Sequence, residues 1–192
     1  MKRFAALLIA APLLTLSFSA VCSAEMNTQM QTTTTTDKQM SQPSQQEGKV
    51  TTWLIVLDQN EISAAKLALG RSKNPDVKKY AQMIIKDHTK NMKDTQMLMK
   101  KTKQKVTETE ESKSLKDMGK NETKKLQPLK EKEFDVAYIN AMIDGHTQAI
   151  QVLDQDISQL PDDSPIKAHL QATRQAVNAH LEKAKEINNT LG

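Results

Sequence analysis

Four polar side chains interrupt apolar rows that recur at helical spacing, and their types make them the strongest candidates for chemistry. They are one carboxylate, Glu61, and three imidazoles, His88, His146 and His180. Each falls in a different predicted helix, on the stripe that faces the core. Burying such groups without partners is costly, so we expect them to meet one another, a metal ion or a water cluster.

The chemistry that these side chains would support is the binding of a transition metal. Imidazole nitrogens with one carboxylate oxygen suit Zn, Cu, Fe, Ni or Mn, and facing helices can supply such ligands. The sequence therefore predicts one metal ion, Zn, Cu or Fe, held by Glu61, His88, His146 and His180. Two alternatives stay open: a buried hydrogen-bonded polar layer without metal, and helices rotated so that some of these side chains face solvent.

Two methionines lie one helical turn from predicted ligands. His88 and Met92 are four residues apart, as are Met142 and His146, so each thioether is a candidate auxiliary ligand that would favour copper. The alternative is that both methionines fill the core, as Met at helical spacing usually does.

Three further polar residues have smaller predicted roles. Asp87 and Asp144 flank the histidine stripe and are candidates to accept a hydrogen bond that fixes an imidazole tautomer. His169, about one turn from Thr173, is expected at the edge of the helical core.

An enzyme such as an oxidase is the least favoured function, and we predict no catalytic residues. Di-iron centres need a Glu on two helices and Glu-x-x-His on two others, but Ile85, Ile143 and Val177 stand three residues before the histidines. The chain also has no nucleophile elbow, Walker loop, Gly-x-Gly-x-x-Gly or cysteine pair. Acidic residues interleave the lysines between Lys93 and Lys132, and aromatic residues are few, so we expect no nucleic-acid partner.

The elements that must position these side chains are helices. Plentiful Ala, Leu, Lys, Gln and Met favour an all-α fold. Apolar residues recur at spacings of three and four in stretches that begin near Thr51, Pro75, Phe134 and Pro165. Asn74 and Ser164 each precede a proline, which is typical of a capped helix start. The pattern predicts an antiparallel four-helix bundle, with residues 107–128 as a short exposed helix or a crossing loop.

The N-terminal residues are typical of a secretory signal. Met1-Lys2-Arg3 precedes an apolar run and the small residues before Glu25, so we expect cleavage after Ala24 and a periplasmic location. A membrane anchor and lipidation at Cys22 are less favoured, since the run contains Pro12 and Val21 stands where a lipobox needs a small residue. No transmembrane helix is expected in the mature chain. The predicted parts are a signal peptide at 1–24, a disordered polar tether at 25–48 and a helical domain at 49–192.

Several short motifs also resemble a known family between about Thr51 and Leu191. They are Asn60-Glu61, Tyr80-Ala81-Gln82-Met83 with Asp87-His88-Thr89, Phe134-Asp135-x-x-Tyr138 with His146, and His180-Leu181 with Ala184. The chain is similar in these to the exported bacterial proteins grouped as domain of unknown function 4142. The resemblance implies an envelope location and a ferritin-like bundle, and the family's recurrent Glu and His positions fall on the four predicted ligands.

Two functions from different classes follow. The first is a periplasmic protein of unsettled role that binds or buffers a metal through Glu61, His88, His146 and His180. The alternative is an envelope stress or scaffold protein that binds an envelope partner without metal and uses its tether for reach.

Overall fold

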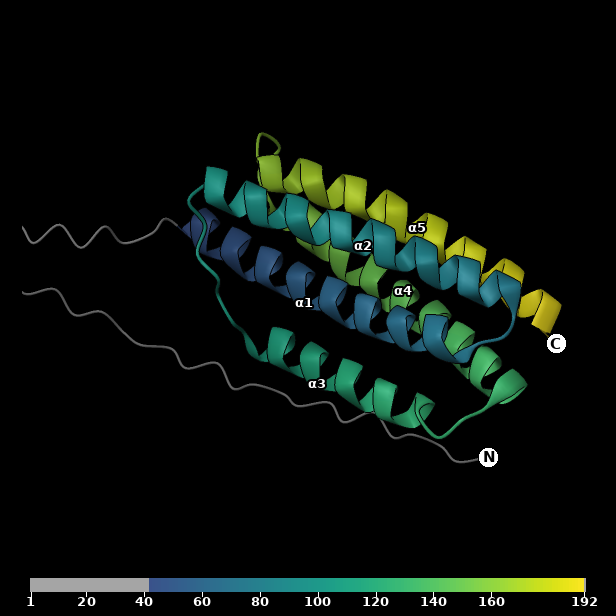
Figure 1. Cartoon of the computed structure of the whole chain (residues 1–192). Helices are drawn as coiled ribbons and strands as arrows, with labels where there is room; N and C mark the ends of the chain where they lie inside the picture. The colour runs from purple at the N-terminus through teal and green to yellow at the C-terminus, as the bar shows by residue number, and fades with distance from the viewer. Residues whose placement is uncertain (1–41, 192) are drawn as a thin grey trace, which may run out of the picture. The chain divides into compact units, whose positions relative to one another are not determined.

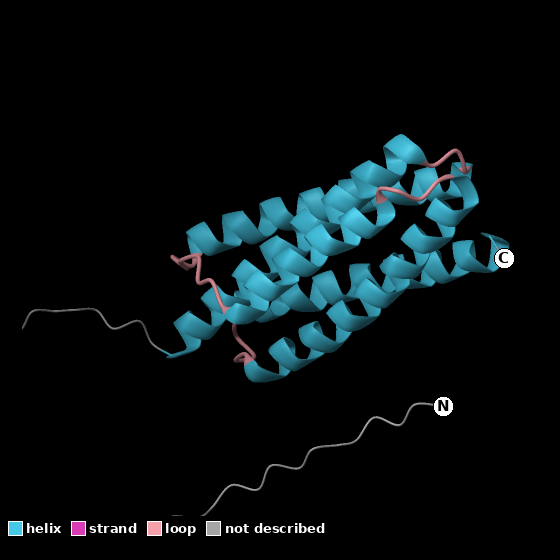
Figure 2. Cartoon of the chain, turned by 90° about the horizontal axis from the view of Figure 1, so that it is seen from below, coloured by secondary structure: helices cyan, strands magenta, loops and turns pink. Residues whose placement is uncertain are grey.

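The computed structural model describes residues 42–191, and this part of the chain is all-helical, as predicted. Its helices are α1 (Gln42–Arg71), α2 (Pro75–Lys101), α3 (Glu110–Leu126), α4 (Glu131–Gln159) and α5 (Pro165–Leu191), and no strand occurs within this range (Figures 1 and 2). The predicted signal peptide at 1–24 and most of the predicted tether lie outside the described residues. Across 42–191, no helix combines the length and apolarity that a membrane span requires.

Two short turns, each closed by a side-chain cap, make α1–α2 and α4–α5 antiparallel hairpins. The Asn74 side-chain oxygen Oδ1 accepts hydrogen bonds from the backbone amides of Asp76 and Val77 at 2.9 and 3.2 Å. The Ser164 hydroxyl accepts from the amides of Ile166 and Lys167 at 3.1 and 3.3 Å. Both caps predicted from the sequence are therefore present, and they satisfy amides that have no partner within the helix.

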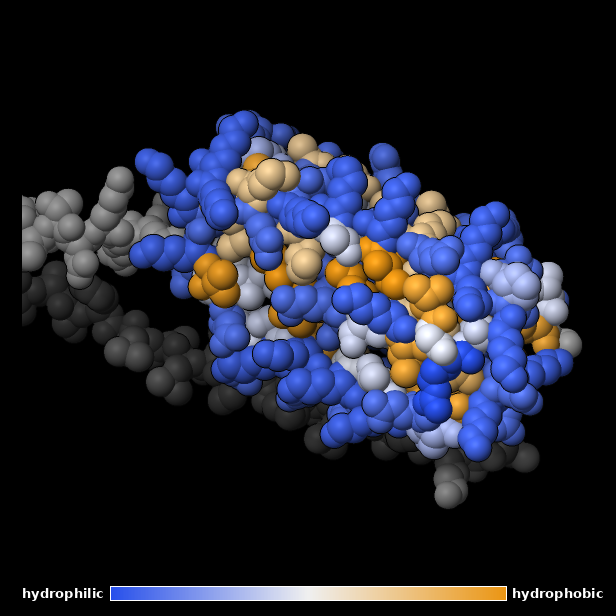
Figure 3. All heavy atoms as spheres, in the orientation of Figure 1, coloured by the Kyte–Doolittle hydropathy of each residue, from blue (hydrophilic) through white to orange (hydrophobic). Residues whose placement is uncertain are grey.

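The two hairpins pack side by side. α1 packs mainly on α2 and α4 mainly on α5, while α2 meets α5 and α1 meets α4 (Figure 1). The apolar faces of these long helices turn inward, and hydrophilic side chains cover most of the face seen in Figure 3. The core therefore runs lengthwise between the four long helices.

Residues 102–130 cross from the first hairpin to the second and contain α3. This helix lies against the outside of α1, with Ser112 and Leu126 as its buried residues (Figure 1). It is the short, exposed helix that was one of the two predictions for residues 107–128. Because the crossing spans the length of the molecule, α2 and α4 run in the same direction (Figure 1).

α1 begins at Gln42, so its first two turns fall inside the segment 25–48 that was predicted as tether. The Glu47 carboxylate accepts hydrogen bonds from Ser164 at 2.5 Å and from Gln104 at 2.6 Å. Gly48 is buried, and a Cβ there would come within 2.9 Å of the Lys105 carbonyl oxygen. Contacts with distant residues thus order a stretch that has almost no aliphatic side chains, and the predicted boundary was wrong there.

Gly119 allows α3 to approach α1 closely, which leads to a testable prediction. A Cβ at Gly119 would overlap the Asn60 amide, which donates to the Leu115 carbonyl at 2.8 Å. We expect Gly119→Ala to lower the free energy of unfolding by about 1 kcal/mol, because overpacking and the lost hydrogen bond outweigh the better helix propensity of Ala.

Gly70→Ala is the matched control for this prediction. Gly70 is also helical, and a Cβ there meets nothing within 4 Å. This variant should raise the free energy of unfolding by up to about 1 kcal/mol. Urea unfolding of both proteins checks the pair, and equal shifts of the same sign would contradict the close approach of α3 to α1.

Candidate metal centre

The core of the long helices is divided by a layer of polar side chains at its middle. One apolar cluster includes Tyr80, Ile84 and Phe134, and the other includes Leu54 and Leu153. Between the two clusters, α1, α4 and α5 each place at least one buried polar side chain in the core. The layer contains all four predicted ligands, each of them buried and each from a different long helix: Glu61, His88, His146 and His180.

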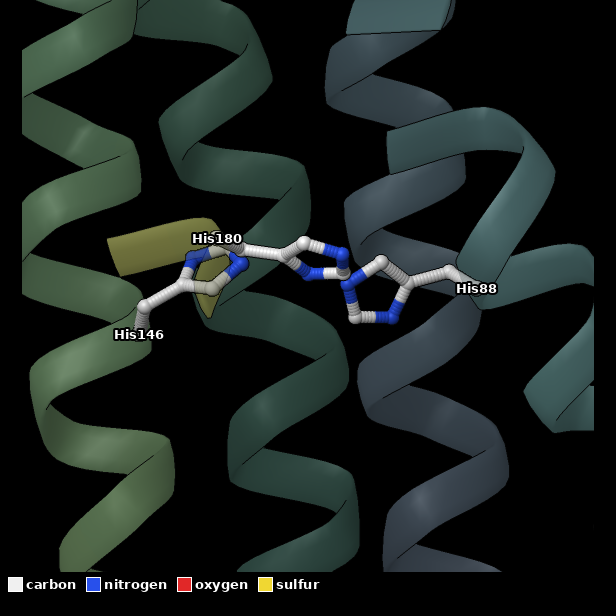
Figure 4. Close-up of side chains that lie close together, drawn as sticks. All are labelled: His88, His146 and His180. Carbon is white, nitrogen blue, oxygen red and sulfur yellow. The ribbon is translucent and has the colours of Figure 1, made fainter. Parts of the chain in front are cut away.

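The three imidazoles converge (Figure 4). Their ring centroids are 5.9 Å apart for His88 and His146, 5.2 Å for His88 and His180, and 5.6 Å for His146 and His180. One ring nitrogen from each lies within 4.8 Å of the others. Nitrogens bound to one Zn²⁺ at about 2.0–2.1 Å would be roughly 3.3 Å apart, so ring movements of roughly 1 Å would complete a metal site. We name these three residues the histidine cluster.

Each ring is oriented by a hydrogen bond from its other nitrogen to an oxygen that can only accept. The His88 Nδ1 donates to Asp58 at 2.8 Å, and the His146 Nδ1 donates to the Met142 carbonyl at 2.9 Å. The His180 Nε2 donates to the Asp87 carboxylate at 3.2 Å. In a neutral imidazole these nitrogens carry the hydrogen, so the opposite nitrogen keeps a free lone pair.

The three opposite nitrogens are buried and unpaired. They are the Nε2 of His88, the Nε2 of His146 and the Nδ1 of His180, and none has a hydrogen-bond partner among residues 42–191. A buried polar atom without a partner normally costs free energy. An arrangement of three such atoms from three helices can bind a cation that accepts nitrogen ligands.

Glu61 lies beside the histidine cluster. Its Oε1 is 3.9 Å from the His146 Nδ1, and its Oε2 is buried without a hydrogen-bond partner in the described chain. The hydroxyls of Tyr80 and Tyr138 are likewise buried and unpaired. Burial, and then the charge of Glu61, raise the pKa of both phenols, so both stay protonated at neutral pH. The structure thus brings three of the four predicted ligands together and places Glu61 at the edge.

The electrostatics of the three rings differ because their acceptors differ. Burial lowers the pKa of His88, but the hydrogen bond to Asp58 and the nearby carboxylates outweigh it, so the net shift is upward. Burial lowers the pKa of His146. Burial and the charge of His88 lower the pKa of His180 to about 4. At neutral pH the last two rings are therefore neutral, which is the form that binds metals.

Asp58 is the most important residue that the sequence did not reveal. It is fully buried, and besides His88 it accepts from the Asn91 amide at 3.2 and 3.1 Å. The Asn91 side-chain oxygen Oδ1 in turn accepts a hydrogen bond from the Thr173 hydroxyl at 2.8 Å. Burial raises the pKa of the Asp58 carboxyl, and these hydrogen bonds oppose that shift. A chain of polar groups from α5 to α1 thus fixes the His88 ring. The available signal was spacing, since Asp58 precedes Glu61 by three residues and shares its helix face.

Of the other side chains that were predicted to take part, some lie beside the histidine cluster and others do not. Asp87 accepts from His180 as expected, whereas Asp144 is exposed on α4. Met142 is buried and contributes its backbone carbonyl to His146, and Met92 is half-buried. His169 is half-buried, and its Nε2 is 2.8 Å from the Thr95 hydroxyl.

Comparisons with known proteins give one match. A family model described as Domain of unknown function (DUF4142) matches residues 29–187, which is most of the chain and includes the whole polar layer. The searches of the curated proteins and of the solved structures found no match.

Proposed function

The chain belongs to the family described as Domain of unknown function (DUF4142), and on that premise we propose that it is an exported protein that binds one transition-metal ion in a ferritin-like four-helix bundle. The support for the ferritin-like arrangement is topological. Two antiparallel hairpins joined by one long crossing, with α2 and α4 in the same direction, match the connectivity of ferritin-like folds.

The observation that carries the metal proposal is the set of three buried, unpaired ring nitrogens. The second nitrogen of each ring donates a hydrogen bond to a carbonyl or carboxylate oxygen, as in the carboxylate–histidine–metal arrangements of known metal sites. Three carboxylates also surround the rings, Asp58 and Asp87 by hydrogen bonds and Glu61 at 3.9 Å. A divalent cation would offset that negative charge and supply the partner that the three nitrogens lack.

The donor set favours Zn²⁺, Cu²⁺ or Fe²⁺ over soft Cu⁺. All three converging donors are imidazole nitrogens, which suit borderline divalent ions. Met142 contributes its backbone oxygen to His146. With Glu61 as a further oxygen donor, the site would hold the metal by four protein ligands, and we propose storage or buffering as its role.

A titration of the metal-free chain with Co²⁺ tests this proposal. We expect one Co²⁺ per chain with the visible absorption of a nitrogen-ligated ion, and at least a tenfold weaker affinity in His88→Gln, His146→Gln and His180→Gln. His169→Gln is the matched control, because His169 is the one of the chain's 4 histidines that does not belong to the histidine cluster. Equal affinity in all these variants, or no uptake by the unmodified chain, would contradict the proposal.

Export is supported by the sequence of the first 24 residues, with Lys2 and Arg3 before an apolar run and small residues at Ser23 and Ala24. The mass of the protein recovered from the periplasmic fraction should correspond to a chain that begins at Glu25. Recovery of the full-length chain from the cytoplasm would contradict export. A scaffold role without metal has less support, since the large hydrophobic side chains with high exposure among residues 42–191 are Met97, Val106 and Met118, and single exposed apolar side chains are common.

A further inference from the structure

A cleft between α2 and α5 reaches the histidine cluster from the surface. Its volume is about 250 Å³, and it is open on one side. The buried side chains of His88, His180 and Thr173 line it, together with the half-buried Asp87, Asp94 and Asn91. Two of the three converging rings thus belong both to the cluster and to the wall of a solvent-accessible cleft.

Two partly exposed carboxylates of the cleft, Asp87 and Asp94, lie between the solvent and the histidine cluster. The Asp87 side chain is 39% exposed, yet one of its oxygens accepts from the Nε2 of buried His180 at 3.2 Å. The Asp94 side chain is 34% exposed and pairs with Lys90 at 2.5 Å. With Lys90 counted against the two aspartates, the charged groups of the lining sum to −1, which attracts cations to the cleft.

The approaches to the cluster along the axis of the core are lined by apolar side chains. The two apolar clusters lie on either side of the polar layer along the core, and the phenyl and phenol rings of Phe134, Tyr80 and Tyr138 pack within one of them. A hydrated cation would need to cross these apolar contacts from either end, whereas the cleft presents carboxylates and imidazoles beside the apolar Ala172, Ala176 and Val177.

We propose that divalent cations load the histidine cluster through the cleft between α2 and α5. Asp94 and Asp87 are the outer carboxylates that capture the ion, which then moves past the His180 ring to the unpaired nitrogens of the histidine cluster. The inference rests on the proposed metal-binding function and adds the route by which the ion arrives. It predicts that the cleft controls the rate of loading more than the final affinity.

Stopped-flow mixing of the metal-free chain with Co²⁺ tests the route. Ala176 is exposed on α5 and lines the cleft, so Ala176→Trp should obstruct it. Ala179 is exposed on the same helix and does not line the cleft, so Ala179→Trp is the matched control. We expect Ala176→Trp to slow loading at least tenfold with less than a threefold change in Kd, and Ala179→Trp to load at the unmodified rate.

A charge variant gives an independent readout of the same route. Asp94→Asn should slow loading several-fold at low ionic strength and less at high ionic strength, because steering by charge is screened by salt. Circular dichroism of each variant confirms its helical fold. Equal loading rates in Ala176→Trp and Ala179→Trp, in a chain that still binds Co²⁺, would overturn the route and leave the metal site standing. Absence of any Co²⁺ uptake by the unmodified chain would overturn both.

Discussion

Asp58→Ala should lower the free energy of unfolding by about 3–5 kcal/mol, the usual effect of removing a buried charged group from its hydrogen-bonded partners. The Asp58 carboxylate is fully buried and accepts from both His88 and Asn91. Its loss would leave the buried His88 Nδ1 and the half-buried Asn91 side-chain amide without this acceptor, in addition to a small cavity.

Chemical denaturation of the metal-free proteins measures this effect, and two further variants calibrate it. Asp58→Asn keeps the size and one acceptor oxygen, so it should fold and lose less stability than Asp58→Ala. Asp154→Ala is the control, because the Asp154 carboxylate also accepts a side-chain hydrogen bond, from Arg174, but on an exposed surface, where such a pair contributes about 0–1 kcal/mol. Losses of equal size at Asp58 and Asp154 would show that the buried chain of polar groups does not hold His88 as described.

Zn²⁺ at a concentration 100 times its Kd should stabilise the chain by about 2.7 kcal/mol, since the folded state alone presents the three converging imidazoles. For a domain of this size that corresponds to a rise in melting temperature of roughly 5–10 °C. The effect should vanish when His88, His146 and His180 are all replaced by Gln, because the nitrogens that bind the ion are then absent.

Differential scanning calorimetry with and without Zn²⁺ checks this second expectation. His180→Gln alone serves where the triple variant folds poorly, because its partner Asp87 is partly exposed and can be hydrated when the ring is lost. His169→Gln should keep the full shift. A shift of unchanged size in His180→Gln would place the bound Zn²⁺ elsewhere on the chain.

The sequence predicted the helices and the positions of the three histidines because both depend on one periodicity. Apolar residues at spacings of three and four mark the buried face of a helix. His88, His146 and His180 fall on that face, so their burial followed from the same pattern, and the structure buries all three. Their convergence depended on helix register, which apolar periodicity constrains poorly, so the sequence could only raise it as a hypothesis.

Asp58 shows what the pattern could not reveal. It lies beside Leu57 on α1, and its contacts with His88 and Asn91 depend on how closely α1 and α2 approach. The start of α1 was missed for a related reason, since Glu47 finds its partners more than fifty residues away in the chain, at Gln104 and Ser164. Polar contacts over such separations depend on tertiary packing, so the local amino-acid composition does not predict them.

X-ray absorption spectroscopy of the Zn²⁺-loaded chain tests the central claim most directly, because it reports the atoms around the ion. The account predicts three imidazole nitrogens at about 2.0–2.1 Å, with the remaining position filled by oxygen. A shell of oxygen atoms alone, without the scattering of imidazole rings, would contradict it.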